Sequence, residues 1–233
     1  MSDPAGVVIF DLDGTLTDSG PGIARSVRYA LERFNALNRA ELPVPAEEAL
    51  RWLVGPPLRE SLARLAGLEN AAALLALYRE RYEKVGMFEN SPYAGIPEAL
   101  GALGAAGHKL FVATSKPEAY ARRILAHFGL ARHFRDIYGS SADGTREDKA
   151  ELLKFLLGRE RIAADPHGVV MVGDRKFDCA GALAAGVSII GAIWGYGGAE
   201  ELLEAGADPA IPTPTQIPSA VRSVFARRAL MRA

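Results

Sequence analysis

The feature that most constrains the fold is the alternation of short apolar runs with longer segments of helical periodicity. Five such runs predict strands, at residues 7–10, 110–113, 136–139, 169–172 and 188–193. Strands separated by helices of this length form parallel pairs, because a parallel connection needs a right-handed helical crossover. Such crossovers cover both faces of the sheet. The sequence therefore predicts an α/β protein with a doubly wound parallel sheet.

Residues from about 17 to 92 interrupt this alternation, because they carry helical periodicity and no convincing strand. One apolar stripe follows Pro21 and a second follows Pro56 and Pro57, as expected for helices that begin near proline. The stripes consist of Ile23, Val27, Leu31 and Phe34, and of Leu58, Leu62 and Leu65. Turn residues at both edges favour a two-stranded hinge. We predict a core of residues 1–16 and 93–233 and a helical domain of residues 17–92.

Composition and charge argue against two classes of protein, nucleic-acid binders and membrane-spanning proteins. The chain has 233 residues with 49% hydrophobic content, enough to bury a sizeable core. Its net charge of -1 argues against a nucleic-acid binder, and no apolar run is long enough to cross a membrane. The single cysteine, Cys179, is expected as a small buried residue and fits a cytoplasmic protein. The sequence does not decide between monomer and dimer.

The first candidate site follows the first predicted strand, in the segment DLDGTLTDS. Asp11 and Asp13 are two residues apart, so on an extended backbone both carboxylates face the same side. One carboxylate could attack a phosphoryl group while the other moves the proton on the bridging oxygen. The alternative is that Asp13 and Gly14 form only a hairpin turn and that Asp11 is a solvated strand end.

A second candidate site is the segment ATSKPEAY, where a predicted strand leads into a helix. Thr114 and Ser115 would bring hydroxyls and free amides to the helix N-terminus, which favours phosphate binding. The alternative is structural, since Ser115 and Glu118 have the spacing of a capping box.

A third candidate is Lys149, near the start of the next predicted helix. A cation there opposes the helix dipole, which favours a functional role over a structural one. The alternative is that the acids beside it in the sequence, Glu147, Asp148 and Glu151, simply neutralise it.

The fourth candidate site follows the strand at 169–172, where Asp174 and Asp178 occur four residues apart. Magnesium prefers oxygen ligands, and Asp174 is the natural one. Asp178 is either a functional acid or an ordinary helix N-cap. Asp11, Thr114 and Asp174 each follow a predicted parallel strand, and ligands of open α/β sheets bind at this carboxyl edge.

These segments resemble the haloacid dehalogenase superfamily. The segment from Asp11 to Thr15 has its D-x-D-G-T pattern, residues 173–178 have its G-D-x-x-x-D pattern, and the stretch through Ser19 is similar to the phosphoglycolate phosphatase branch. The resemblance implies a Rossmann-like core, and it implies that the inserted helical segment at residues 17–92 is a cap domain. It also implies a magnesium-dependent phosphatase that works through an aspartyl-phosphate.

The resemblance assigns roles to the candidate residues. Asp11 is the expected nucleophile, and Asp13 the general acid and base. Magnesium is expected on Asp11, on the backbone carbonyl of Asp13 and on Asp174, while Asp178 helps to hold metal-bound water and the lysine. Thr114, Ser115 and Lys116 are expected to bind the phosphoryl group. Lys149 is expected to neutralise the phosphate, but no proline follows it as in many relatives, so Lys116 competes for this role.

The expected substrate is a small phosphorylated metabolite, such as phosphoglycolate or a nucleoside monophosphate. Two alternatives remain open: a phosphomutase of sugar phosphates on the same fold, and a non-catalytic phosphate-binding protein. Specificity is expected in the helical domain, where Arg59 follows the turn at 54–57. This arginine either pairs with an anionic substrate or is solvated on a simple helix connection.

Overall fold

The computed structural model describes residues 5–141 and 145–231. It divides into two compact units, which we describe separately. The first consists of Met1–Thr17 and Pro92–Ala233, and the second of Asp18–Ser91. We call them the core unit and the helical unit.

The core unit contains a parallel sheet with the strand order β5-β4-β1-β6-β7-β8. Its strands are β1 (Val7–Phe10), β4 (Lys109–Pro117), β5 (Asp136–Ser140), β6 (Val169–Gly173), β7 (Ser188–Ala192) and β8 (Ala210–Ile211). The five predicted strands are confirmed. The edge strand β8 was not predicted, because two residues beside Pro209 are too few to show periodicity.

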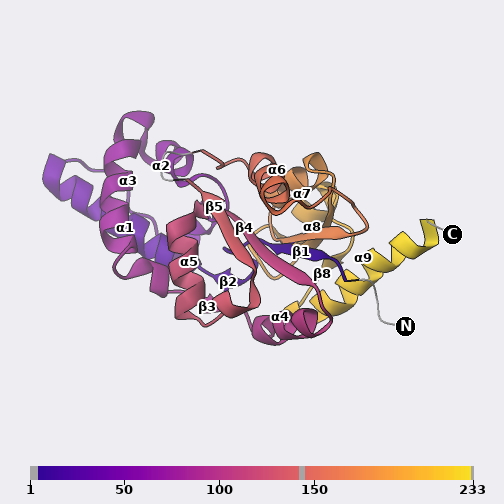
Figure 1. Ribbon diagram of the computed structural model, residues 1–233. Coiled ribbons are helices and arrows are strands. Elements are labelled where there is room, and N and C mark those ends of the chain that lie inside the picture. The colour runs from indigo at the N-terminus through magenta and orange to yellow at the C-terminus, as the bar shows by residue number, and fades with distance from the viewer. Residues whose placement is uncertain (1–4, 142–144, 232–233) are drawn as a thin grey trace. The chain divides into compact units, whose positions relative to one another are not determined.

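Helices cover both faces of this sheet, as the doubly wound prediction requires (Figure 1). One face carries α6 (Lys149–Glu160), α7 (Lys176–Ala184) and α8 (Gly198–Glu204), and the other carries α4 (Ile96–Ala105), α5 (Glu118–His127) and α9 (Ile217–Met231). Side chains alternate between the faces: Ile9 and Met171 pack into the cluster under α6 to α8. The fold is therefore α/β with an inserted helical domain.

The central strand β1 is buried along its whole length. It pairs with β4 on one side and with β6 on the other, with Val7 opposite Lys109 and Val169. Cys179 lies in the cluster under α6 to α8 with none of its surface exposed, and burial raises its thiol pKa to about 12. The prediction of a small buried cysteine is confirmed.

The helical unit packs α1 (Gly20–Asn38) and α2 (Leu58–Ala66) against α3 (Leu68–Tyr82). The predicted stripe on α1 is buried, and of the second stripe Leu62 is fully buried. Gly22 of α1 lies against the backbone of Gly86, where any side chain would overlap the Gly86 carbonyl.

The remaining short elements belong to both units. They are β2 (Thr17–Asp18), β3 (Ser91–Pro92), η1 (Glu47–Leu53), η2 (Gly86–Phe88), η3 (Ala131–His133) and η4 (Pro214–Gln216). The strands β2 and β3 pair where the chain passes between the units.

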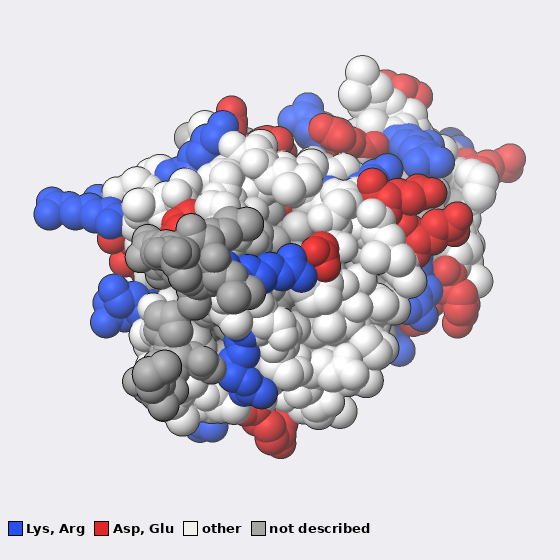
Figure 2. All heavy atoms as spheres, turned by 90° about the vertical axis from the view of Figure 1, so that its right-hand side faces the viewer, with Lys and Arg blue, Asp and Glu red and all other residues white. Residues whose placement is uncertain are grey.

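On the face drawn in Figure 2, acidic and basic side chains are interspersed and form no large patch of one charge. Across residues 5–141 and 145–231, no helix combines the length and the apolar character that a membrane span needs.

Candidate active site

Asp11 directly follows β1 and continues its pairing. Its backbone N–H donates to the carbonyl of Val172 in β6 at 3.0 Å, and only 7% of the residue is exposed. Its carboxylate accepts a hydrogen bond from Lys149, with 2.7 Å between Oδ1 and Nζ. The alternative of a solvated strand end is therefore wrong.

Lys149 is the first residue of α6 and is buried among acceptors from three other segments. Besides Asp11, its Nζ lies 2.8 Å from Oδ1 of Asp178 and donates to the carbonyl of Ala113 at 3.0 Å. Asp148, beside it in the sequence, instead caps α6 by accepting the N–H of Glu151. The alternative that neighbouring acids neutralise Lys149 is wrong, because its ion pairs are with Asp11 and Asp178.

Asp174 follows β6 and has none of its surface exposed. Its Oδ1 accepts the hydroxyl of Thr15 at 2.9 Å, and its Oδ2 accepts the backbone N–H of Tyr196 at 2.9 Å. Gly14 approaches the same carboxylate with a φ of 88°, so a side chain there would be strained and would overlap Asp174. The glycine after Asp13 thus makes room for this acid.

Asp178 lies in the first turn of α7, which begins at Lys176. The N-cap is Arg175, so the alternative that Asp178 is the N-cap is wrong. One carboxylate oxygen, Oδ2, accepts the Arg175 N–H at 3.1 Å, while Oδ1 pairs with Lys149. Asp178 therefore joins the start of α7 to the buried lysine.

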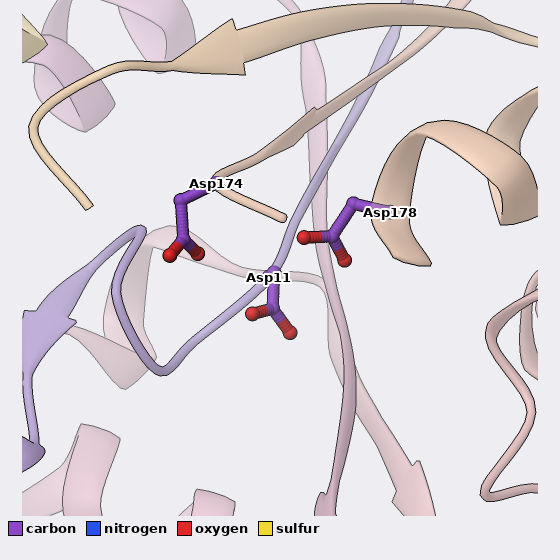
Figure 3. A group of neighbouring side chains, drawn as sticks. All are labelled: Asp11, Asp174 and Asp178. Carbon is purple, nitrogen blue, oxygen red and sulfur yellow. The ribbon is translucent and has the colours of Figure 1, made fainter. Parts of the chain in front are cut away.

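Three of these carboxylates gather at one point. Asp11, Asp174 and Asp178 each place an oxygen within 4.8 Å of the others, and Figure 3 shows them arriving from two strand ends and a helix start. Burial raises the pKa of Asp11 to about 6, although Lys149 opposes the shift. Burial, reinforced by Asp178 and Asp11, also raises the pKa of Asp174 well above its ordinary range.

The charge balance of this cluster favours a cation. Burial alone would lower the pKa of Lys149, but Asp11 and Asp178 outweigh it and raise the pKa, so the lysine stays charged. The cluster thus contains three buried carboxylates, and its one lysine pairs with two of them, Asp11 and Asp178. Hard oxygen donors with surplus negative charge are what a divalent cation such as Mg²⁺ binds, so the residues present fit such an ion.

Asp13 lies at the edge of the three-carboxylate cluster and is not one of its members. Its Oδ2 is 2.6 Å from Nζ of Lys116, and its buried Oδ1 has no hydrogen-bond partner among the described residues. The backbone N–H of Lys116 donates to Oγ1 of Thr114 at 3.2 Å. The structure thus brings together Asp13, Thr114 and Lys116 beside Asp11.

The segment around Ser115 differs from the predicted strand-to-helix junction. The strand β4 continues to Pro117, with a shift in its pairing to β5 after Thr114, and α5 begins only at Glu118. The hydroxyl of Ser115 donates to the carbonyl of Glu147 at 3.0 Å, so the capping-box alternative is wrong. Thr114 and Ser115 therefore lie at the carboxyl end of a strand, before the helix.

Arg59 is the second residue of α2 and is exposed in the helical unit. Its role in specificity stays a prediction. Thr15, Trp194 and Tyr196 had no predicted role, although all three belong to the hydrogen bonds around Asp174. The available signal was the sequence W-G-Y-G directly after a predicted strand, since closely spaced glycines indicate close backbone packing.

Comparisons with known proteins agree with this geometry. The sequence profile of the family described as haloacid dehalogenase-like hydrolase matches residues 8–192. A 5'-nucleotidase of Pseudomonas aeruginosa is 46% identical over 84% of the chain and 86% of its own length. A phosphoglycolate phosphatase of Nitrosospira multiformis is 30% identical over 90% of the chain and 92% of its own length.

Two further similarities come from a kinase sequence and a solved structure. The tyrosine-protein kinase PtkA of Mycobacterium tuberculosis is 44% identical over 83% of the chain, which covers 64% of that protein. The crystal structure of a predicted phosphatase from Clostridium acetobutylicum superposes with a TM-score of 0.84 at 36% identity, covering 96% of this chain and all of that one.

Proposed function

The chain belongs to the haloacid dehalogenase-like hydrolase family and is a phosphatase, and we propose that it hydrolyses a small phosphorylated metabolite through an aspartyl-phosphate on Asp11. The observation that carries this proposal is the placement of Asp11. It is a buried carboxylate at the end of the central strand, paired with Lys149 and close to two further acids. A carboxylate held in this way is a positioned nucleophile.

The first half of the reaction transfers the phosphoryl group to the protein. A carboxylate oxygen of Asp11 attacks phosphorus, and the bond between phosphorus and the ester oxygen breaks. Protonated Asp13 gives its proton to the departing oxygen, which leaves as an alcohol. Lys116, 2.6 Å from Asp13, holds that side chain at the edge of the site before substrate arrives.

The second half returns the protein to its starting state. Asp13, now a carboxylate, takes a proton from a water molecule as the water oxygen attacks phosphorus. The bond between phosphorus and Asp11 breaks, inorganic phosphate leaves, and Asp11 is again a carboxylate. One residue thus serves as acid and then as base.

The remaining residues hold charge and position. A bound Mg²⁺, held by Asp11, Asp174 and the backbone carbonyl of Asp13, would act as a Lewis acid that offsets the phosphoryl charge. Lys149 offsets the charge of Asp11, and Asp178 holds Lys149 in place. Thr114, Ser115 and Lys116 orient the phosphoryl oxygens. We assign the helical unit the role of a cap that excludes bulk water.

Among small phosphate esters, a nucleoside 5'-monophosphate is the first candidate, because the relative that is 46% identical is named a 5'-nucleotidase. Phosphoglycolate is the second, on the name of the 30% identical relative. Both are water-soluble metabolites, and a single buried cysteine fits a reducing, cytoplasmic setting.

The test is a phosphate-release assay over nucleoside monophosphates, phosphoglycolate, pyrophosphate and sugar phosphates with Mg²⁺ present. We expect release from at least one ester, and loss of both turnover and the phosphoenzyme in Asp11→Asn, since an amide is a poor nucleophile. Asp208→Asn, an exposed acid of the core unit, is the matched control and should keep full activity.

Other outcomes would replace the proposal. Undiminished turnover in Asp11→Asn would exclude the aspartyl-phosphate. Retention of a radioactive phosphoryl group in a sugar phosphate, without free phosphate, would instead make the protein a phosphomutase.

A further inference from the structure

The segment directly after β7, Trp194 to Gly197, meets the loop after β1 around a single acid. We call it the 194–197 segment. Its role depends on the proposed function, because the acid in question is Asp174, which we assign to the metal. The contacts involve only residues of the core unit.

Two backbone groups of this segment bind Asp174 directly. The N–H of Tyr196 donates to Oδ2 at 2.9 Å, and the N–H of Gly197 donates to the Asp174 carbonyl at 3.2 Å. Gly195 lies against the same residue, since a side chain there would overlap Cβ of Asp174. The segment therefore holds both the carboxylate and the backbone of Asp174.

The other carboxylate oxygen is held through a relay. The indole N–H of Trp194 donates to the Thr15 carbonyl at 3.0 Å, and the Thr15 hydroxyl donates to Oδ1 of Asp174 at 2.9 Å. The Trp194 side chain thus ties the loop after β1 to the loop after β7. Among the described residues, this bond from the indole N–H is the one hydrogen bond that a side chain makes to the backbone of Thr15.

Fixing both oxygens of a buried carboxylate sets its orientation. A free carboxylate rotates about its last torsion, and holding it for an ion costs free energy at binding. Hydrogen bonds to both oxygens remove that rotation beforehand, and each oxygen keeps a lone pair for a cation. Residues that orient ligands in this way typically change metal affinity by about 10–100-fold when replaced.

We propose that Trp194 is a positioning residue, which acts through Thr15 and together with the backbone of the 194–197 segment to pre-orient Asp174 for a divalent cation. Its indole N–H donates to the Thr15 carbonyl and not to the Asp174 carboxylate itself. Its loss therefore weakens cation binding and leaves the chemical step nearly intact once the site is saturated.

The chain offers a direct optical readout, because it contains two tryptophans, Trp52 and Trp194. Trp52 lies in the helical unit, where Arg64 stacks over its ring. The variant Trp52→Phe leaves Trp194 as the only tryptophan. Titration of this variant with Mg²⁺ should change the emission of Trp194, with a dissociation constant equal to that of the unmodified protein by calorimetry.

Calorimetric Mg²⁺ titration then compares the variants. Trp194→Phe removes the N–H donor and keeps an aromatic ring, and we expect its Mg²⁺ dissociation constant to rise about tenfold. Trp52→Phe is the matched control and should show no rise. At saturating Mg²⁺, kcat of Trp194→Phe should lie within about threefold of the unmodified protein, which separates positioning from chemistry.

Variants of Thr15 test the same hydrogen-bond relay from its other end. Thr15→Val removes the hydroxyl at nearly equal volume and should weaken Mg²⁺ binding at least as much as Trp194→Phe. Thr15→Ser restores a hydroxyl and should recover most of the affinity.

Equal Mg²⁺ affinity in Trp194→Phe, Thr15→Val and the unmodified protein would overturn the inference, even if phosphatase activity is confirmed. Weakened Mg²⁺ binding in a protein that hydrolyses no phosphate ester would support the inference and contradict the proposed function. A lower kcat for Trp194→Phe at saturating Mg²⁺, with unchanged affinity, would give Trp194 a different role.

Discussion

The charged residues of the candidate site in the core unit and the ion-paired residues of the helical unit lie in different environments. In the core unit, Asp11, Lys149, Asp174 and Asp178 are each less than 10% exposed. In the helical unit, the ion pairs of Arg25 and Arg81 with Glu47 and Glu89 involve side chains that are 21–45% exposed.

This difference separates stability from function. Burying a charge costs several kcal/mol, and a buried ion pair seldom recovers more than that cost. Exposed pairs cost little and contribute little. A cluster of four buried charges is therefore expected where chemistry requires it, whereas the pairs of the helical unit are compatible with packing alone.

The largest effect is expected from the buried lysine. Lys149→Ala should lower kcat by at least about 100-fold, because it removes a preorganised charge from the transition state. Lys116→Ala is the comparison variant and should lose less, since its contact is with Asp13 at the edge of the cluster. Steady-state kinetics decides between them, and the reverse ranking would make Lys116 the neutralising lysine.

The next effect is a pH dependence of stability, which we expect to arise in the core unit because Asp11 lies there. An ordinary aspartate releases its proton near 3.8, but Asp11 in the folded protein does so near 6. The cation-free folded protein therefore binds this proton more tightly than the unfolded chain does. The destabilisation from a charged Asp11 is fully present above about pH 6 and is relieved as the pH falls toward 4.

Mg²⁺ requires the carboxylate form and competes with that proton. Its dissociation constant should rise by at least about tenfold for each pH unit below 6, because Asp174, whose pKa is also raised, can hold a second competing proton. The Mg²⁺-induced increase in Tm should be larger at about pH 7.5 than at about pH 5. Scanning calorimetry with and without Mg²⁺ measures both stabilities. An increase in Tm that does not change with pH would contradict the raised pKa of Asp11.

A smaller, substrate-dependent effect is expected in the helical unit. Arg59→Ala should lower kcat/KM by about tenfold for the best anionic substrate, because one charge-assisted contact is lost. Hydrolysis of a small aryl phosphate should stay nearly unchanged, since the core unit handles the phosphoryl group. Arg64→Ala, on the same helix, is the control. Equal losses on both substrates would remove Arg59 from specificity.

The smallest effect is expected at the exposed ion pairs. Arg25→Ala should lower the free energy of unfolding by less than about 1 kcal/mol, as typical for surface pairs. Leu31→Ala on the same helix should cost about 2–5 kcal/mol, because Leu31 is fully buried. Denaturant titration compares them, and an equal loss in both would show that exposed pairs hold the helical unit together.

Local pattern was enough to predict most of the fold. The strand at Val7–Phe10 and the helix stripe at Ile23, Val27, Leu31 and Phe34 follow from periodicity, since both faces of β1 and one face of α1 are buried. The edge strand β8 could not be predicted, because it depends on its register with β7 rather than on its own sequence.

The site was predictable where residues follow strands, and not where partners come from distant loops. Asp11 and Asp174 converge because their strands are neighbours. The partners of Lys149 and Ser115 are set by tertiary packing, so the nearby acids and the capping-box spacing were misleading. Trp194 contributes through a hydrogen bond to a residue about 180 positions away, which local sequence does not show.

The pairing of β1 has a consequence for the order in which the chain folds. Both partners of β1 lie far along the chain, starting at Lys109 and Val169, while the helical unit is one continuous segment. During synthesis the helical unit can pack as soon as it emerges, but β1 keeps two open edges until β4 and β6 exist. Contacts of such long range close slowly. Asp11 therefore takes its place late, and a chain halted before Val169 exposes an apolar edge that is prone to aggregate.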